Sequence, residues 1–237
     1  GIYIDPIPRV TVSCLTGFLW AVSLCKLQNR RVAFGIMFAA GLLMYVHPVS
    51  APTLATALWF GYVWKHWQSD CMRGNVGNMV LLFAFFLAGA YPVASNYLGN
   101  HVHGPVDSMD TIREIMNYRF ARPYMRYWEG LQEFLFCFLV KKPLLSLFAV
   151  GILIVKRFGE AEDQEKMKLL VMWCVGIFVS AVVVFSADQE WARITGGAPV
   201  EVDLIRGTRF LLPVSISGMF LACYVLTKRV AEGLSCE

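Results

Sequence analysis

Residues 41–64, GLLMYVHPVSAPTLATALWFGYVW, are apolar on both sides of one short polar break at residues 47–52. The run contains no Asp, Glu, Lys or Arg, which is typical of a segment that lies in lipid. Pro48 and Pro52 lack a donor N–H and interrupt a helix. Broken backbone is tolerated at membrane depth only where protein, water or a substrate cavity satisfies it. The pattern therefore predicts two helices that meet at a tip important for function or packing.

The composition of the whole chain indicates the same class of protein. Of the 237 residues, 57% are hydrophobic and only 16% are charged, and the mean hydropathy is +0.54. A soluble domain normally carries about a quarter charged residues. The formal net charge of +4 is modest and gives no reason to expect nucleic acid as a partner. We therefore expect an integral membrane protein whose immediate partner is membrane lipid.

Apolar runs separated by charged or proline-containing segments predict an all-α, polytopic membrane helical bundle. About seven short transmembrane helices are expected, and no linker divides them, so residues 1–237 are expected to form a single transmembrane domain. The expected spans cover residues 10–25, 32–46, 49–64, 76–98 with a bend near Pro92, 144–155, 169–187 and 204–226. Residues 156–168 are expected to be a charged loop.

One interfacial amphipathic helix is expected between the fourth and fifth spans. Tyr and Trp side chains lie beside arginines in residues 111–130, and an apolar run continues to residue 140. Such a segment lies naturally in the plane of the lipid headgroups. Lysines and arginines gather in alternate connections, at residues 26–31, 65–73, 156–168 and 228–229, and we expect these to face the cytoplasm.

His47 is the first candidate site residue, because an imidazole can donate, accept or titrate near neutral pH. Ionisable side chains at membrane depth are costly and often functional. The alternative is a structural histidine whose ring binds a carbonyl freed by Pro48.

A second candidate is the aromatic-basic segment that carries Arg119, Arg122 and Arg126. Spacings of three and four place the arginines on one helical face, and guanidinium groups suit phosphate oxygens. The alternative is simple anchoring at the membrane interface.

Asp203, Arg206 and Arg209 lead into the last expected span and form the third candidate. Cations at a helix N-terminus oppose the macrodipole, which favours anions there, so something negative should compensate. A bound phosphate is one solution, since free N–H groups at a helix start already bind anions. A local Asp203–Arg206 pair with an acidic loop is the other.

His101 and His103, followed by Asp107 and Asp110, are of types that bind divalent cations. The group is short and no second histidine pair supports it, so we expect neither a metal site nor a cofactor.

The many short spans, the helix that ends in LMYVHPVSA and the segment DLIRGTRFLLP at the start of the last span resemble the GT-C glycosyltransferases. These are multispanning membrane enzymes that use polyprenyl-phosphate sugars, and bacterial membrane proteins of unknown function share their architecture. The family places an acidic catalytic residue in the first outer loop, just after its first span. No such loop follows the first span here, so the resemblance implies a carboxy-terminal portion of a longer chain, with the catalytic carboxylate upstream or absent.

The resemblance implies the lipid-phosphate-binding part of a membrane glycosyltransferase, in the inner membrane of a bacterium. Arg206, Arg209 and Arg122 would hold the leaving polyprenyl phosphate, and His47 would line the cavity. The catalytic residue and any protein partner stay unknown. Two alternatives remain: a transporter or permease with broken helices at Pro48 and Pro92, and a non-catalytic membrane subunit whose aromatic-basic helix docks another protein.

Overall fold

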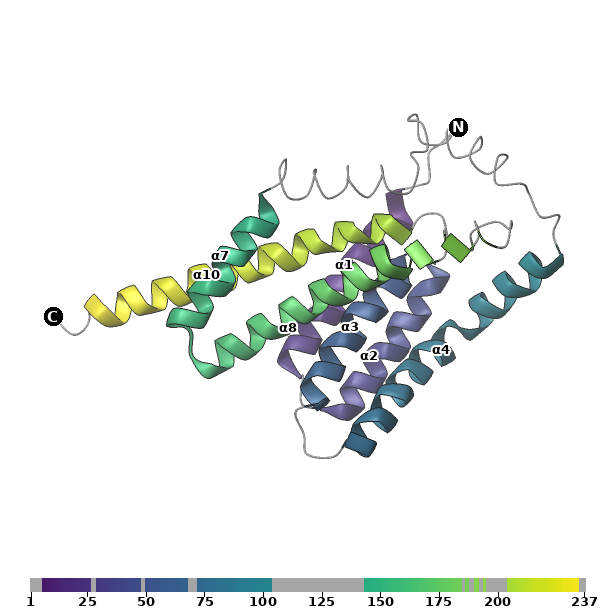
Figure 1. The fold of residues 1–237 in the computed structure, drawn as a ribbon, viewed down its shortest axis with the longest axis horizontal. Helices are drawn as coiled ribbons and strands as arrows, with labels where there is room; N and C mark the ends of the chain where they lie inside the picture. Colours follow the sequence, from purple (N-terminus) through teal and green to yellow (C-terminus); the bar gives the residue numbers. More distant parts are fainter. Residues whose placement is uncertain are drawn as a thin grey trace.

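The computed structural model describes most of the chain, and every regular element in the described part is helical (Figure 1). The described residues are 6–26, 29–47, 50–67, 72–103, 143–184 and 204–234, with residues 186, 187, 190, 191 and 194. The expected all-α class is confirmed for these ranges. The expected interfacial helix of residues 111–140 lies outside them.

In the part of the chain that the structure describes, seven longer helices make up the bundle. They are α1 (Pro6–Cys25), α2 (Arg30–Leu42), α3 (Ser50–Trp67), α4 (Met72–His103), α7 (Leu144–Phe158), α8 (Ala161–Phe178) and α10 (Leu211–Leu234). Three irregular helical segments adjoin them: a 3-10 segment η1 (Leu43–Tyr45) after α2, a π-helical segment η3 (Val179–Val184) after α8, and a 3-10 segment η4 (Leu204–Phe210) before α10.

Within the described residues, three helical stretches are long and apolar enough to cross a membrane, namely Val76–Asn96, Ala161–Val184 and Gly207–Gly233. Large apolar side chains on these and neighbouring helices are exposed, for example Phe220 at 72% and Tyr91 at 69%. Water disfavours so much contiguous apolar surface, whereas lipid tails accept it. The structure therefore supports a membrane protein.

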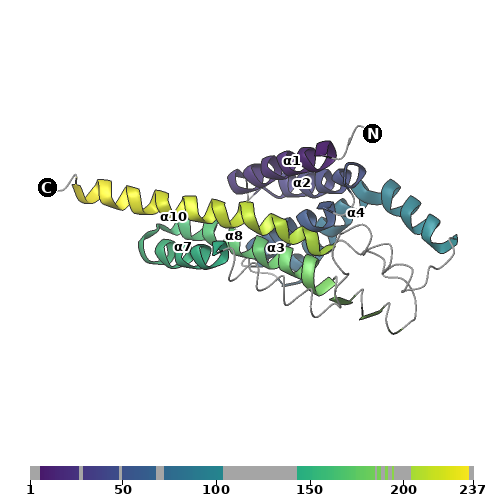
Figure 2. The same ribbon diagram turned by 90° about the horizontal axis from the view of Figure 1, so that it is seen from above.

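Helix α3 lies in the middle of the bundle and contacts α2, α4, α8 and α1. On one side of α3 lies α2, which packs against α4. On the other side lies α8, which packs against α10, and α10 packs against α7 (Figures 1 and 2). Hydrogen bonds join α3 to two neighbours: the Ser23 and Tyr62 hydroxyls lie 2.6 Å apart, and Trp59 donates to the Met79 carbonyl at 3.0 Å. Side-chain hydrogen bonds of this kind fix one helix against the next where both surfaces are apolar.

Helices α2 and α4 approach each other closely through two glycines. A Cβ on Gly41 would overlap the Phe86 carbonyl and lie 2.9 Å from the Ala90 nitrogen. A Cβ on Gly89 would overlap the Phe38 carbonyl in turn. Small residues that let two backbones meet are the usual means of packing helices in lipid, where the hydrophobic effect supplies little attraction.

The prediction that residues 156–168 form a charged loop is wrong. Helix α7 continues to Phe158, and α8 begins at Ala161, so only a short turn separates them. The Glu160 N–H donates to the Asp163 carboxylate at 3.2 Å, which caps the start of α8, and the Glu162–Lys166 pair at 2.7 Å supports its first turns. The charged residues therefore lie in the last turn of α7 and the first turns of α8 and did not prevent helix formation.

Other boundaries also differ from the expected ones. Helix α1 begins at Pro6 rather than residue 10, because proline is well tolerated in the first helical turn. Helix α4 runs from Met72 to His103 with Pro92 inside it, so the helix is not broken at Pro92 as the transporter alternative would require. Helix α10 continues past the expected end to Leu234. The expected start of the fifth span at Leu144 agrees with the structure.

Candidate functional site at the helix breaks

Irregular backbone gathers at one end of the bundle. The π-helical segment η3 contacts the 3-10 segment η4, and both contact α3, whose N-terminus follows the interruption after η1. We call this the break end. π-Helical and 3-10 turns within or beside α-helices frequently mark functional sites, since they redirect side chains and free carbonyls.

The break end brings together two of the site residues expected from the sequence. Ser50, the first residue of α3, lies between them: its Oγ is 2.9 Å from Nδ1 of His47. The Arg209 guanidinium, in η4, donates to the same hydroxyl. Residues 162 positions apart in the chain thus share one buried hydroxyl, since Ser50 is only 1% exposed.

The direction of the Arg209–Ser50 hydrogen bond follows from the chemistry of arginine. A guanidinium group donates and never accepts, so the Ser50 oxygen accepts from Arg209. The Ser50 hydroxyl can then donate its single proton to His47 Nδ1 or accept a second hydrogen bond from a protonated Nδ1, because a hydroxyl oxygen has two acceptor lone pairs. In this arrangement Ser50 holds the orientation of both ionisable side chains.

The electrostatics at the break end favour an anion. Arg209 lies against the N-terminus of α3, so a cation is placed beside the positive end of a helix dipole. The His47 carbonyl accepts from Ser50 N–H at 3.2 Å and from Ala51 N–H at 3.3 Å, which satisfies part of the α3 terminus. A negative group bound there would interact favourably with the guanidinium and with the N–H groups of the helix start.

Close packing holds η4 against α3. Gly207 faces Thr53, and a Cβ on Gly207 would meet the Thr53 Cγ2 atom at 2.9 Å. Ser180, in η3, donates to the Thr53 hydroxyl at 3.4 Å, and both side chains are buried. His47, Ser50, Thr53, Ser180 and Arg209 together form what we call the break-end cluster.

Three aromatic side chains pack next to the break-end cluster. The Arg209 guanidinium lies 5.2 Å from the centre of the Phe210 ring, and Phe210 packs edge-on against Trp20 at 6.2 Å. Trp20 in turn stacks on Trp173 at 5.3 Å. These contacts bring α1, α8 and η4 together, and a cation–π contact is worth about 0.5–1 kcal/mol at exposed sites and more when desolvated.

Among the residues that the structure describes, three buried polar atoms outside the break-end cluster have no hydrogen-bond partner. They are Thr16 Oγ1, Trp20 Nε1 and Ser215 Oγ. A buried polar atom without a partner costs about 1–3 kcal/mol. The Trp20 indole is adjacent to Phe210, so its N–H is a further donor close to the cluster.

The other expected site residues are placed only in part. The Arg206 backbone belongs to η4, one turn before Arg209. Asp203, Arg119, Arg122 and Arg126 lie outside the described residues.

His101 and His103 belong to the last turn of α4, while Asp107 and Asp110 lie outside the described part. Within the described ranges no group of three or more His, Cys, Asp and Glu residues is arranged to hold a metal ion.

Thr53 and Ser180 are the members of the cluster that the sequence did not indicate. Thr53 follows Ser50 at helical spacing within an apolar run, which is a weak signal for a polar stripe on one helix face. Ser180 offers no such signal, because its partner lies 127 positions away in the chain.

In comparisons with known proteins, no family model, no characterised protein and no solved structure matches this chain.

Proposed function

We propose that this protein is the lipid-phosphate-binding part of a membrane glycosyltransferase that takes its sugar from a polyprenyl-phosphate donor. The observation that carries the proposal is the Arg209–Ser50–His47 arrangement at the start of α3. A guanidinium held beside the N-terminus of α3 is suited to a phosphate, whose oxygens accept several N–H groups at once.

The proposed protein crosses the membrane seven times, in the inner membrane of a bacterium. The seven longer helices supply the segments, and their chain order alternates between the break end and the opposite end of the bundle (Figure 1). Lys26, Lys65 and Lys166 lie at that opposite end, which agrees with a cytoplasmic assignment by the positive-inside tendency.

In this proposal Arg209 holds the phosphate and stabilises the charge that develops on it as the sugar leaves. The His47 ring is a second hydrogen-bonding group at the same site. Arg206 and Arg122 would complete the cationic surroundings. The base that deprotonates the acceptor is a carboxylate outside this cluster, since His47 Nδ1 is already engaged with Ser50.

The position of the irregular segments favours an enzyme over a transporter. Transporters place interrupted helices near the middle of the bilayer, where the substrate is enclosed. Here η1 and η3 follow the ends of α2 and α8, η4 precedes α10, and α4 is continuous through Pro92. A site at the ends of helices suits a ligand whose phosphate stays at the membrane surface.

The test is binding of a polyprenyl phosphate to purified protein in detergent, measured by native mass spectrometry. Arg209→Gln removes the charge but keeps a hydrogen-bonding amide, and we expect affinity to fall at least about tenfold, as for loss of a charge-assisted hydrogen bond. Arg157→Gln, which removes an exposed arginine from the last turn of α7, is the matched control and should bind like the original protein. If Arg209→Gln bound polyprenyl phosphate as tightly as Arg157→Gln, the proposed glycosyltransferase function would be wrong.

A further inference from the structure

A cavity lies at the opposite end of the bundle from the break-end cluster. It has a volume of about 580 Å³ and opens between the end of α1, the end of α3 and the start of α8. Leu24 and Leu169 supply apolar walls. Binding pockets for small molecules typically measure about 300–1,000 Å³. We call this the basic-end pocket.

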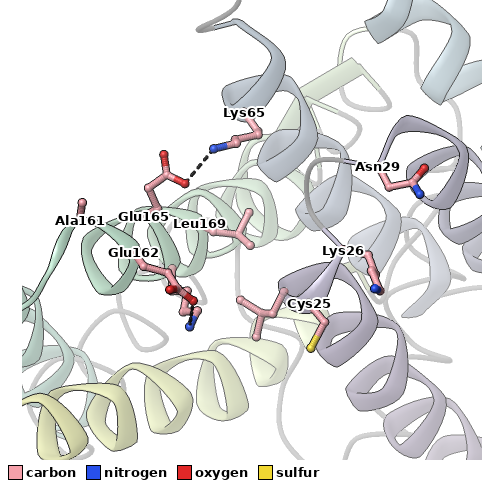
Figure 3. A pocket seen from close by; sticks show the side chains of 10 residues that line it. Cys25, Lys26, Asn29, Lys65, Ala161, Glu162, Glu165 and Leu169 are labelled. Atoms are coloured by element: carbon pink, nitrogen blue, oxygen red, sulfur yellow. Dashed lines mark hydrogen bonds and ion pairs between the residues drawn. The ribbon is translucent and has the colours of Figure 1, made fainter. Parts of the chain in front are cut away.

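Ion pairs hold two of the pocket's lysines in place. The Lys65 ammonium group donates to Glu165 at 2.8 Å, and the Lys65 side chain is only 15% exposed. Lys166 pairs with Glu162 at 2.7 Å, one turn away along α8. Figure 3 shows the Lys65–Glu165 pair on one side of the pocket and Cys25 with Lys26 on another. The charged groups are therefore positioned before any ligand arrives.

The charges that line the pocket do not balance. Three lysines and two glutamates leave one positive charge in excess. Each glutamate is paired with a lysine of the pocket, whereas the Lys26 side chain has no partner among the described residues. The excess charge therefore resides on Lys26, at the end of α1.

We propose that the basic-end pocket binds one phosphate group carried by a small polyol, such as the glycerol phosphate headgroup of an anionic phospholipid. Lys26 supplies the unbalanced charge, and the Lys65 and Lys166 ammonium groups offer their remaining N–H bonds to phosphate oxygens. Leu24 and Leu169 contact the carbon skeleton. A choline headgroup fits poorly, because its cation would need a carboxylate, and both glutamates are already paired.

The location of the pocket agrees with a lipid as the source of that phosphate. The pocket lies where the apolar faces of α1, α3 and α8 give way to charged residues, which is the level of phospholipid headgroups. Basic pockets between helix ends on the cytoplasmic side of membrane proteins bind anionic headgroups. A soluble glycerol phosphate has the same recognition chemistry, so the experiment has to separate the two sources.

Native mass spectrometry of the full chain in detergent tests the proposal with three probes: phosphatidylglycerol, phosphatidylcholine and free glycerol 3-phosphate. We expect the protein to retain phosphatidylglycerol in preference to phosphatidylcholine. Loss of the unpaired charge in Lys26→Gln should weaken retention about tenfold, as for one charged hydrogen bond. Lys168→Gln, an equal change of charge at an exposed position of α8 outside the pocket, should leave retention unchanged.

The probes also identify the source of the phosphate. Retention of phosphatidylglycerol that free glycerol 3-phosphate does not reduce assigns the pocket to lipid, and displacement by the free compound assigns it to a soluble metabolite. Equal retention of phosphatidylglycerol by the original protein, Lys26→Gln and Lys168→Gln would overturn the proposal. Lys26 is exposed, so its substitution should leave the melting temperature unchanged. The break-end variant Arg209→Gln should not alter this binding, which keeps the two sites separate.

Discussion

Single residues at the break end decide how far η4 can approach α3. Gly207 and Thr53 are in direct contact, and Thr53 is completely buried with no room to withdraw. Gly207→Ala should therefore push η4 outwards, move the Arg209 guanidinium from Ser50 and cost about 1–3 kcal/mol of stability, as for other overpacked sites. The melting temperature and the affinity for polyprenyl phosphate should therefore both be lower in this variant.

The control for that substitution is Gly17→Ala in α1. A Cβ on Gly17 would have no atom within 4 Å, so alanine there should be neutral or stabilise by about 0.5–1 kcal/mol through its better helix propensity. A Gly207→Ala protein as stable as Gly17→Ala would show that the Thr53 contact does not set the position of η4.

Part of the break-end cluster could be predicted from the sequence because charge in apolar surroundings is costly and therefore conspicuous. His47 was found on that basis, and Arg209 was found because a cation at a helix N-terminus opposes the macrodipole. Thr53 could not be found in the same way, since a hydroxyl in a helix can bond to its own backbone, as Thr56 does to the Pro52 carbonyl at 2.7 Å. Only the fold brings the Thr53 hydroxyl to Ser180.

At the level of helices, the contact between α2 and α4 depends on two facing glycines. Gly89→Ala would force its Cβ into the Phe38 carbonyl and to 3.1 Å from the Leu42 nitrogen, and backbone cannot yield as a flexible side chain does. We expect this variant to separate the two helices and to lower the melting temperature by several degrees, about 2–4 °C per kcal/mol for a chain of this size.

The same two helices provide the controls. Gly35 lies on α2 and Gly77 on α4, and a Cβ on either would have no atom within 4 Å. Gly35→Ala and Gly77→Ala should therefore melt at or above the temperature of the original protein. If Gly89→Ala melted with them, the close approach of α2 and α4 would not be what holds this pair together.

The ends of helices could be predicted where an apolar run is interrupted by proline and charged residues. They could not be predicted where a segment is merely rich in charge. The start of α7 after Pro143 was found because lysines and a proline interrupt an apolar run. The helical ends of α7 and α8 within residues 156–168 were missed because the segment was assigned as a loop from its charge, although alanine, glutamate, glutamine and lysine are good helix formers in any solvent. Charge indicates where a helix leaves the lipid, whereas helix ends depend on capping groups such as the Asp163 carboxylate.

At the scale of the whole molecule, side chains from the last turns of α10 form hydrogen bonds with the turn between α7 and α8 at residues 158–160. Lys228 donates to Glu160 at 2.6 Å, and Arg229 donates to the Phe158 carbonyl at 2.9 Å. The hydrogen bond and charge of Lys228 lower the pKa of the Glu160 carboxyl below its ordinary value. This contact is therefore fully present above the ordinary carboxyl pKa and is lost as the pH falls through the lowered value.

We expect hydrogen exchange in the α7–α8 turn to be faster below about pH 4 than near pH 7, after correction for the intrinsic pH dependence of exchange. Glu160→Gln should show the faster exchange already at neutral pH and lose the additional acid step. Glu232→Gln, which removes a carboxylate from the same end of α10, should keep that step. An acid step that survives in Glu160→Gln would assign the pH dependence to another group.

Helix α2 is short for the membrane crossing that we propose for it. Its 13 residues extend about 20 Å, and the three residues of η1 add about 6 Å, against a hydrocarbon layer about 30 Å thick. The bilayer must thin beside this helix or cover its end. In either case His47 lies deeper than the surrounding headgroups. A polyprenyl phosphate dissolved in the leaflet could then reach His47 by lateral diffusion. A water-soluble donor would first have to pass below the level of the surrounding headgroups.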